Sequence, residues 1–168
     1  MISPQLIALS LLAVVSASPL DARATCSPNF EGAGIAVGAP GGFVFPGGLN
    51  RGHSAFVPAW HIQQTGQPNG GYIFKDIWNN NIALTRNSDN TVTVAPASDS
   101  GTDRNQQFQI TCQSCSGGAS TAPPMTLIAS TCNIRWIGDT SLCLQVPDRM
   151  FLSPCDNISG FGPFSFST

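Results

Sequence analysis

Side chains that commonly catalyse reactions or bind metals are few in this chain of 168 residues. It has 2 histidines, 7 Lys and Arg residues, and 9 Asp and Glu residues. His53 and His61 are the only side chains suited to act as a base near neutral pH. Neither lies in a nucleophile motif or beside Cys, Asp or Glu in a metal-ligand spacing. We therefore predict that the protein is not an enzyme and binds neither a metal ion nor a cofactor.

The 6 cysteines are the next candidates for chemistry. Cys112 and Cys115 have the spacing of a redox or zinc motif, but no βαβ pattern follows them and a second ligand pair is missing. We predict three structural disulfides. Cys143 and Cys155 lie on two strand-like runs joined by Pro147-Asp148, so we expect them to pair across a hairpin. Cys26, Cys112, Cys115 and Cys132 allow three connectivities, of which ring size slightly favours Cys26 with Cys112 or Cys115.

Disulfides require an oxidising compartment, and the N-terminal sequence agrees with secretion. An apolar run over residues 6–15 is followed by Val15-Ser16-Ala17, which suits a signal-peptidase site. We predict a signal peptide over 1–17, a short pro-segment over 18–23, and a secreted domain over 24–168. The apolar run is too short for a permanent membrane anchor. The sequon at Asn157 predicts a glycosylation site.

Composition predicts the class of fold. The 17 glycines and 13 prolines are distributed so that few windows could hold a helix of three turns. The absence of any run of Lys or Arg argues against nucleic acid and anionic lipid as partners. We expect one compact all-β domain with many turns.

An internal threefold repeat organises this domain. Each unit contains an alternating apolar pair, a run that ends in proline, and a closing aromatic strand. Successive prolines are 38 and 58 residues apart, and successive closing aromatics are 36 and 56 residues apart. Both markers therefore place an insertion of 20 residues between the second and third units. We expect this insertion to form a loop over 112–131. The markers are Ile35-x-Val37, Ile82-x-Leu84 and Leu142-x-Leu144; Pro58, Pro96 and Pro154; Tyr72, Phe108 and Phe164.

These residues resemble the ricin-B-like lectins, and in particular their small secreted fungal members. The resemblance covers about residues 25–166 and is carried by Cys143-Leu-Gln-Val146, by Leu152-Ser-Pro-Cys155, and by Gln106-Gln107-Phe108 at the place of the family's Gln-x-Trp signature. It implies a β-trefoil of three pseudo-repeats, stabilised by disulfides, that binds carbohydrate. Gln106 and Phe108 are then expected to support the scaffold.

The family's galactose-type pocket does not carry over. The third unit has Gln145 at the position of the sugar-binding acid and Ser153 at that of the aromatic platform. Asn69 and Asn105 remain at the position of the family's amide. Trp60 has no counterpart in the other units and is our candidate for stacking on a sugar, whereas Trp78 and Trp136 recur and are expected in the core.

Two functions follow as hypotheses. The first is a secreted, lectin-like protein that binds a glycan or glycoprotein through Asn69, Asn105 and Trp60. The alternative is a protein-binding module such as a protease inhibitor, which would present the loop over 38–52 or the disulfide-held loop over 115–132 to a protease.

Overall fold

The computed structural model describes residues 25–50, 57–65, 71–98, 101–157 and 163–168. The predicted signal peptide, the pro-segment, His53 and Asn69 lie outside these ranges. Within them the chain forms twelve β-strands and three short 3-10 helices, so the all-β class is confirmed. No helix of the described chain has the length and apolar character needed to span a bilayer.

The strands follow one another along the chain in short segments. They are β1 (Gly34–Ala39), β2 (Gly42–Phe45), β3 (Gly48–Asn50), β4 (Trp60–Gln64), β5 (Gly71–Asp76), β6 (Ile82–Arg86), β7 (Val92–Pro96), β8 (Phe108–Cys115), β9 (Leu127–Trp136), β10 (Asp139–Gln145), β11 (Phe151–Pro154) and β12 (Phe164–Ser167). The 3-10 helices are η1 (Arg104–Gln106), η2 (Ala119–Thr121) and η3 (Cys155–Asn157).

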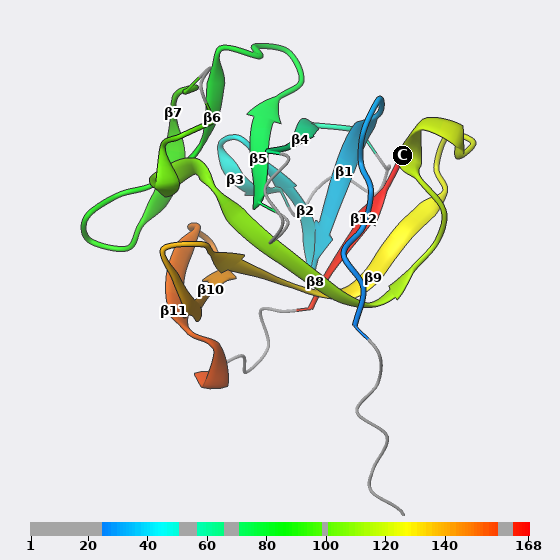
Figure 1. Ribbon diagram of the computed structural model, residues 1–168. Coiled ribbons are helices and arrows are strands. Elements are labelled where there is room, and N and C mark those ends of the chain that lie inside the picture. Colours follow the sequence, from blue (N-terminus) through cyan, green and yellow to red (C-terminus); the bar gives the residue numbers. More distant parts are fainter. Residues whose placement is uncertain (1–24, 51–56, 66–70, 99–100, 158–162) are drawn as a thin grey trace, which may run out of the picture.

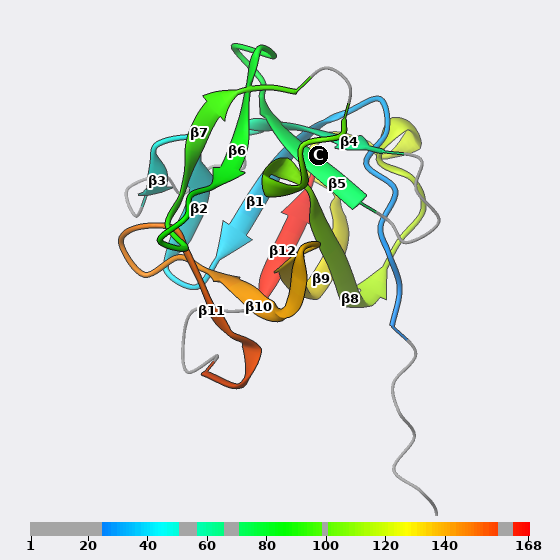
Figure 2. The ribbon, with the colours of Figure 1, turned by 60° about the vertical axis from the view of Figure 1, so that its left-hand side comes forward.

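Six of these strands form a closed antiparallel barrel. Going around it, β1 pairs with β4, β4 with β5, β5 with β8, β8 with β9, β9 with β12, and β12 returns to β1. The remaining strands form three hairpins, β2–β3, β6–β7 and β10–β11, which extend from β1, β5 and β9 (Figures 1 and 2). The chain therefore consists of three successive four-stranded units, each of which contributes its first and fourth strands to the barrel.

Aromatic side chains fill the barrel. Trp60, Phe108 and Phe164 begin the fourth strand of their units, and all three are buried. The Phe74 ring packs edge-on against Trp60 and Phe108, with ring centroids 5.9 and 5.8 Å apart. Alternation along each strand directs these residues inward.

The predicted end of the first unit is wrong. Tyr72 is buried, but it lies on β5, the first strand of the second unit, and Trp60 occupies the place equivalent to Phe108 and Phe164. Ile35-x-Val37 lies on the barrel strand β1, whereas Ile82-x-Leu84 and Leu142-x-Leu144 lie on hairpin strands. The alternating pattern predicts a strand in each case but does not distinguish a barrel strand from a hairpin strand.

Gln106 and Phe108 support the scaffold, as expected. The Gln106 amide nitrogen donates to Pro96 O at 2.7 Å and to Thr85 Oγ1 at 3.1 Å, and its amide oxygen accepts from Ser98 N at 2.8 Å. The side chain is buried. The Gln106 side chain thus holds η1 against the β6–β7 hairpin.

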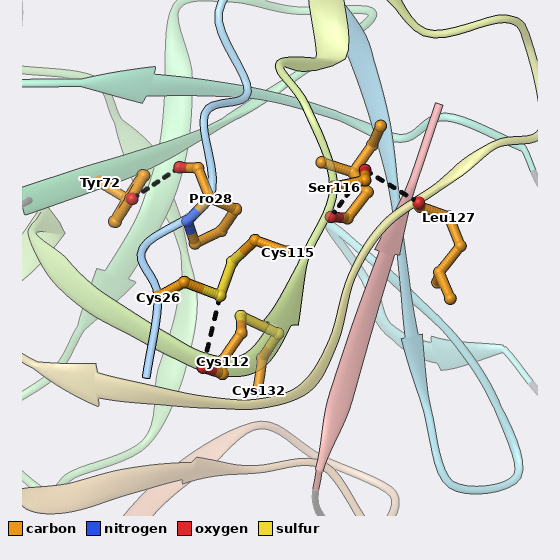
Figure 3. Close-up of a disulfide and its surroundings, with 9 residues drawn as sticks. Cys26, Pro28, Tyr72, Cys112, Cys115, Ser116, Leu127 and Cys132 are labelled. Atoms are coloured by element: carbon orange, nitrogen blue, oxygen red, sulfur yellow. Dashed lines mark hydrogen bonds between the residues drawn. A yellow bond between two sulfur atoms is a disulfide. The ribbon is translucent and has the colours of Figure 1, made fainter. Parts of the chain in front are cut away.

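The structure contains three disulfides. Cys143 pairs with Cys155 as predicted. Cys26 pairs with Cys115, and Cys112 pairs with Cys132 (Figure 3). The predicted insertion is a loop only in part, because β8 runs to Cys115 and β9 begins at Leu127. The two strands pair across Cys112 and Cys132, which leaves residues 116–126 as the connection. Three disulfides are compatible with an extracellular protein.

We expect Gln106→Ala to lower the free energy of unfolding by about 2–3 kcal/mol, because it removes three hydrogen bonds from a buried site. Chemical denaturation monitored by fluorescence measures this. The matched control is Gln63→Ala, whose side chain is exposed and whose loss should cost less than about 0.5 kcal/mol. Equal effects of the two substitutions would contradict the scaffold role of Gln106.

Candidate functional site

Trp60 is not available to stack on a sugar. Its side chain is 0 % exposed, and its indole Nε1 donates to Val44 O at 2.7 Å. As the first residue of β4 it points into the barrel, where it connects that strand to the β2–β3 hairpin. This corrects the expectation from sequence.

Asn69 and Asn105, the two asparagines predicted to bind a sugar, differ in what the structure describes of them. Asn69 lies outside the described residues. Asn105 lies on η1 with an exposed side chain, and its backbone N–H donates to Asp103 Oδ1 at 2.9 Å. Asp103, and not Asn105, therefore caps this turn, which leaves the Asn105 amide free to contact a ligand.

Trp136 is partly buried, and its ring contacts Arg86 and Gly138. The Arg86 guanidinium lies 4.1 Å above the ring centroid. A Cβ added to Gly138 would be 2.2 Å from the ring, so the backbone of Gly138 lies close against it. The indole Nε1 donates to Arg104 O at 2.8 Å. Trp136 packs against the edge of the core, which agrees with the expectation from sequence.

Two carboxylates flank this cluster of Arg86, Trp136 and Gly138. The pKa of Asp89 is lowered by hydrogen bonds from the Thr91 side chain and backbone, and that of Asp139 by the equivalent bonds from Ser141. The positive charge of Arg86 lowers both pKa values further. These groups stabilise the two turns and belong to the scaffold.

Gln145, which the resemblance to the ricin-B-like lectins places at the sugar-binding acid position, does not contact a sugar either. It is 2 % exposed, and neither its amide nitrogen nor its amide oxygen has a hydrogen-bond partner. The side chain is enclosed by the protein and is not available to a ligand.

The expectation that Trp78 lies in the core is wrong, because 66 % of its surface is exposed. It is the one aromatic side chain among the exposed large hydrophobic residues of the described chain. Its backbone N–H donates to Asp76 Oδ1 at 2.8 Å, and Asn81 N donates to Asn79 Oδ1 at 3.2 Å. The turn between β5 and β6 thus presents the indole to solvent from a hydrogen-bonded backbone.

A polar groove of about 470 Å³ opens beside the same turn. One wall is the segment from Phe30 to Ala33 and the other is β4 from His61 to Gln64, while Lys75 and Asn80 complete the lining. β1 pairs with β4 only at Trp60 and His61, so the edge of β4 beyond His61 borders the groove. Phe30 and Ile62 are buried and form an apolar floor.

Polar and charged side chains surround this floor. His61, Gln63, Gln64, Asn80 and Glu31 are exposed. Lys75, the only lysine of the chain, is 8 % exposed and lies directly across the strand pair from His61. The groove therefore offers amides, a carboxylate, an imidazole and an ammonium group.

Sequence reasoning missed this site, although one signal was present. Trp78 is followed by three asparagines, and asparagine favours turns. A tryptophan inside a turn of this composition is expected at the surface. No comparable signal marks Lys75, because its burial depends on its neighbours in the sheet, His61 and Ala83.

No known protein family, curated protein or solved structure matches the chain. The described residues contain no group of three or more His, Cys, Asp or Glu side chains placed to hold a metal ion.

We expect Gly138→Ala to displace the Trp136 ring and to lower the free energy of unfolding by about 1–3 kcal/mol, because the new Cβ would overlap the indole. Tryptophan fluorescence and thermal unfolding measure the two effects. Gly117→Ala is the control, since a Cβ there meets nothing within 4 Å. An unchanged emission spectrum in Gly138→Ala would contradict the proposed packing of Trp136.

Proposed function

We propose that the protein is a secreted, lectin-like β-trefoil of the ricin-B-like kind that binds carbohydrate through a relocated site. The arrangement of three four-stranded units around a six-stranded barrel supports the trefoil. The buried amide of Gln106, two residues before the buried ring of Phe108, supports the resemblance to the Gln-x-Trp signature.

One observation carries the functional proposal: the exposed indole of Trp78 shares a turn with Asn80, which lines the polar groove. A sugar ring has hydroxyl groups around its edge and an apolar C–H face. Amides supply a donor and an acceptor to adjacent hydroxyls, and an exposed aromatic ring stacks on the C–H face. In this proposal Trp78 provides the platform, and Gln63, Gln64 and Asn80 hydrogen-bond the hydroxyls.

The site is shallow, and its parts are held in place before a ligand arrives. His61, Gln63 and Lys75 belong to paired barrel strands. The Trp78 turn is fixed by Asp76. Little ordering entropy is then lost on binding, although a single shallow contact gives weak affinity that gains from multivalent display.

A second candidate, a protein-binding module, is favoured by the connection between β8 and β9. Met125 and Leu127 are 71 % and 53 % exposed. Their loop is held by Thr168, whose backbone N–H donates to Thr126 O at 3.1 Å and whose hydroxyl donates to Pro123 O at 2.7 Å. A rigid loop that exposes apolar side chains is what an inhibitor requires.

For the lectin proposal, we expect the protein to bind on a glycan array, and Trp78→Ala to weaken that binding at least about tenfold through loss of stacking. Trp78→Phe should retain most of the affinity, because a ring remains. Since Trp78 is exposed, neither change should shift the thermal unfolding temperature.

Asn105→Ala is the matched variant for the site predicted from sequence. We expect it to bind like the wild type, since Asn105 lies on η1 and does not line the groove. A blank array at high protein loading would refute the lectin proposal. Loss of binding in Asn105→Ala but not in Trp78→Ala would refute the proposed site.

For the second candidate, the expected result is stoichiometric inhibition of at least one member of a panel of serine, cysteine and aspartic proteases. Met125→Glu should abolish it, because it places a charge where the loop exposes an apolar side chain. Trp78→Ala is the control and should inhibit normally. A panel without inhibition or complex formation eliminates this candidate.

A further inference from the structure

Lys75 is an unusual lysine because most of its side chain is buried and its ammonium group has no partner among the described residues. Only 8 % of its surface is exposed. Among the described residues, no carboxylate lies within ion-pair distance of its Nζ, and no acceptor oxygen receives a hydrogen bond from it. β5 runs between β4 and β6 at this point, so His61 and Ala83 flank Lys75 in the sheet.

The aliphatic stem of a lysine can be buried while its ammonium group stays accessible. Lys75 has this arrangement, because most of its side chain is buried and yet it lines the groove. An ammonium group that receives no counter-charge from the described protein is suited to bind an anion that enters the groove.

Lys75 lines the groove, so that anion can reach it. The other residues that line the groove indicate what kind of anion would bind. Glu31 is a carboxylate on the same groove, which disfavours a ligand with several negative charges. Gln63, Gln64 and Asn80 favour uncharged hydroxyls around the acid group. The combination fits a single carboxylate attached to a polyhydroxylated ring.

We propose that the groove selects acidic saccharides, with Lys75 binding the carboxylate of a uronic or sialic acid residue. This inference rests on the proposed lectin function and names the class of sugar for that same site. Lys75 supplies a charge-assisted hydrogen bond to the carboxylate. The neighbouring amides and Trp78 then bind the remainder of the ring.

The test uses matched pairs of ligands that differ in the acid group. Titration calorimetry compares trigalacturonic acid with its fully methyl-esterified form, and 3′-sialyllactose with lactose. The wild type should bind the acid of at least one pair about tenfold more tightly than its neutral counterpart. Lys75→Met should remove this preference, and Lys75→Arg should retain most of it.

The folding of the variants provides a second measurement. Lys75→Met should unfold at about the same temperature as the wild type, because the methionine side chain fills the space of the buried lysine stem and the ammonium group that it removes has no partner among the described residues. A retained fold ensures that loss of acid preference reports on binding.

Failure of this inference can be distinguished from failure of the lectin proposal. If neutral and acidic members of both pairs bind alike, or if the acid preference survives in Lys75→Met, the role of Lys75 is wrong and carbohydrate binding stands. If neither pair binds and the glycan array is also blank, the lectin proposal itself fails.

Discussion

Closure of the barrel by β1 and β12 is the constraint on which the rest of the structure depends. These are the first and last strands, and they pair through Ala36 with Ser167, Val37 with Phe166 and Gly38 with Ser165. The approach is close, because a Cβ on Gly38 would lie 2.5 Å from Ser165 Oγ. Phe166 brings its ring to 4.8 Å from that of Phe30. The aromatic interior is therefore completed only when both ends of the domain are in place, which makes folding dependent on contacts distant in sequence.

The segment before β1 connects this closure to the candidate site. Cys26 forms a disulfide with Cys115 and exchanges two backbone hydrogen bonds with Cys112. The Tyr72 hydroxyl donates to Pro28 O at 2.7 Å (Figure 3), and burial of this phenol raises its pKa. Phe30 then enters the core and forms the floor of the groove. The disulfide restricts the unfolded chain, and in the folded protein it also fixes one wall of the groove.

Sequence reasoning predicted the class of fold and the features set by local chemistry. The Cys143–Cys155 pair follows from a short hairpin, and the role of Gln106 from a polar residue beside a core aromatic. Sequence reasoning could not locate the end of the first unit, because the barrel strand β1 and the hairpin strands share one alternating pattern of apolar residues. Nor could it rank the tryptophans: Trp60 lies on a strand whose partners enclose it, and Trp78 lies in a turn where nothing covers it. The exposure of a side chain depends on the residues packed around it, and strand pairing across the whole chain determines which residues those are.

Strand pairing also explains why the candidate groove lies away from Gln145, the residue that the resemblance to the ricin-B-like lectins places at the sugar-binding acid position. Gln145 is enclosed, so that part of the third unit serves packing. Between the first and second units, β1 pairs with β4 only at Trp60 and His61, and beyond His61 the edge of β4 borders the groove. The pairing of β4 with β5 holds the backbone of this edge in place, and alternation along β4 turns Ile62 inward and His61 and Gln63 outward. The outward side chains can therefore contact a ligand without any change in the core.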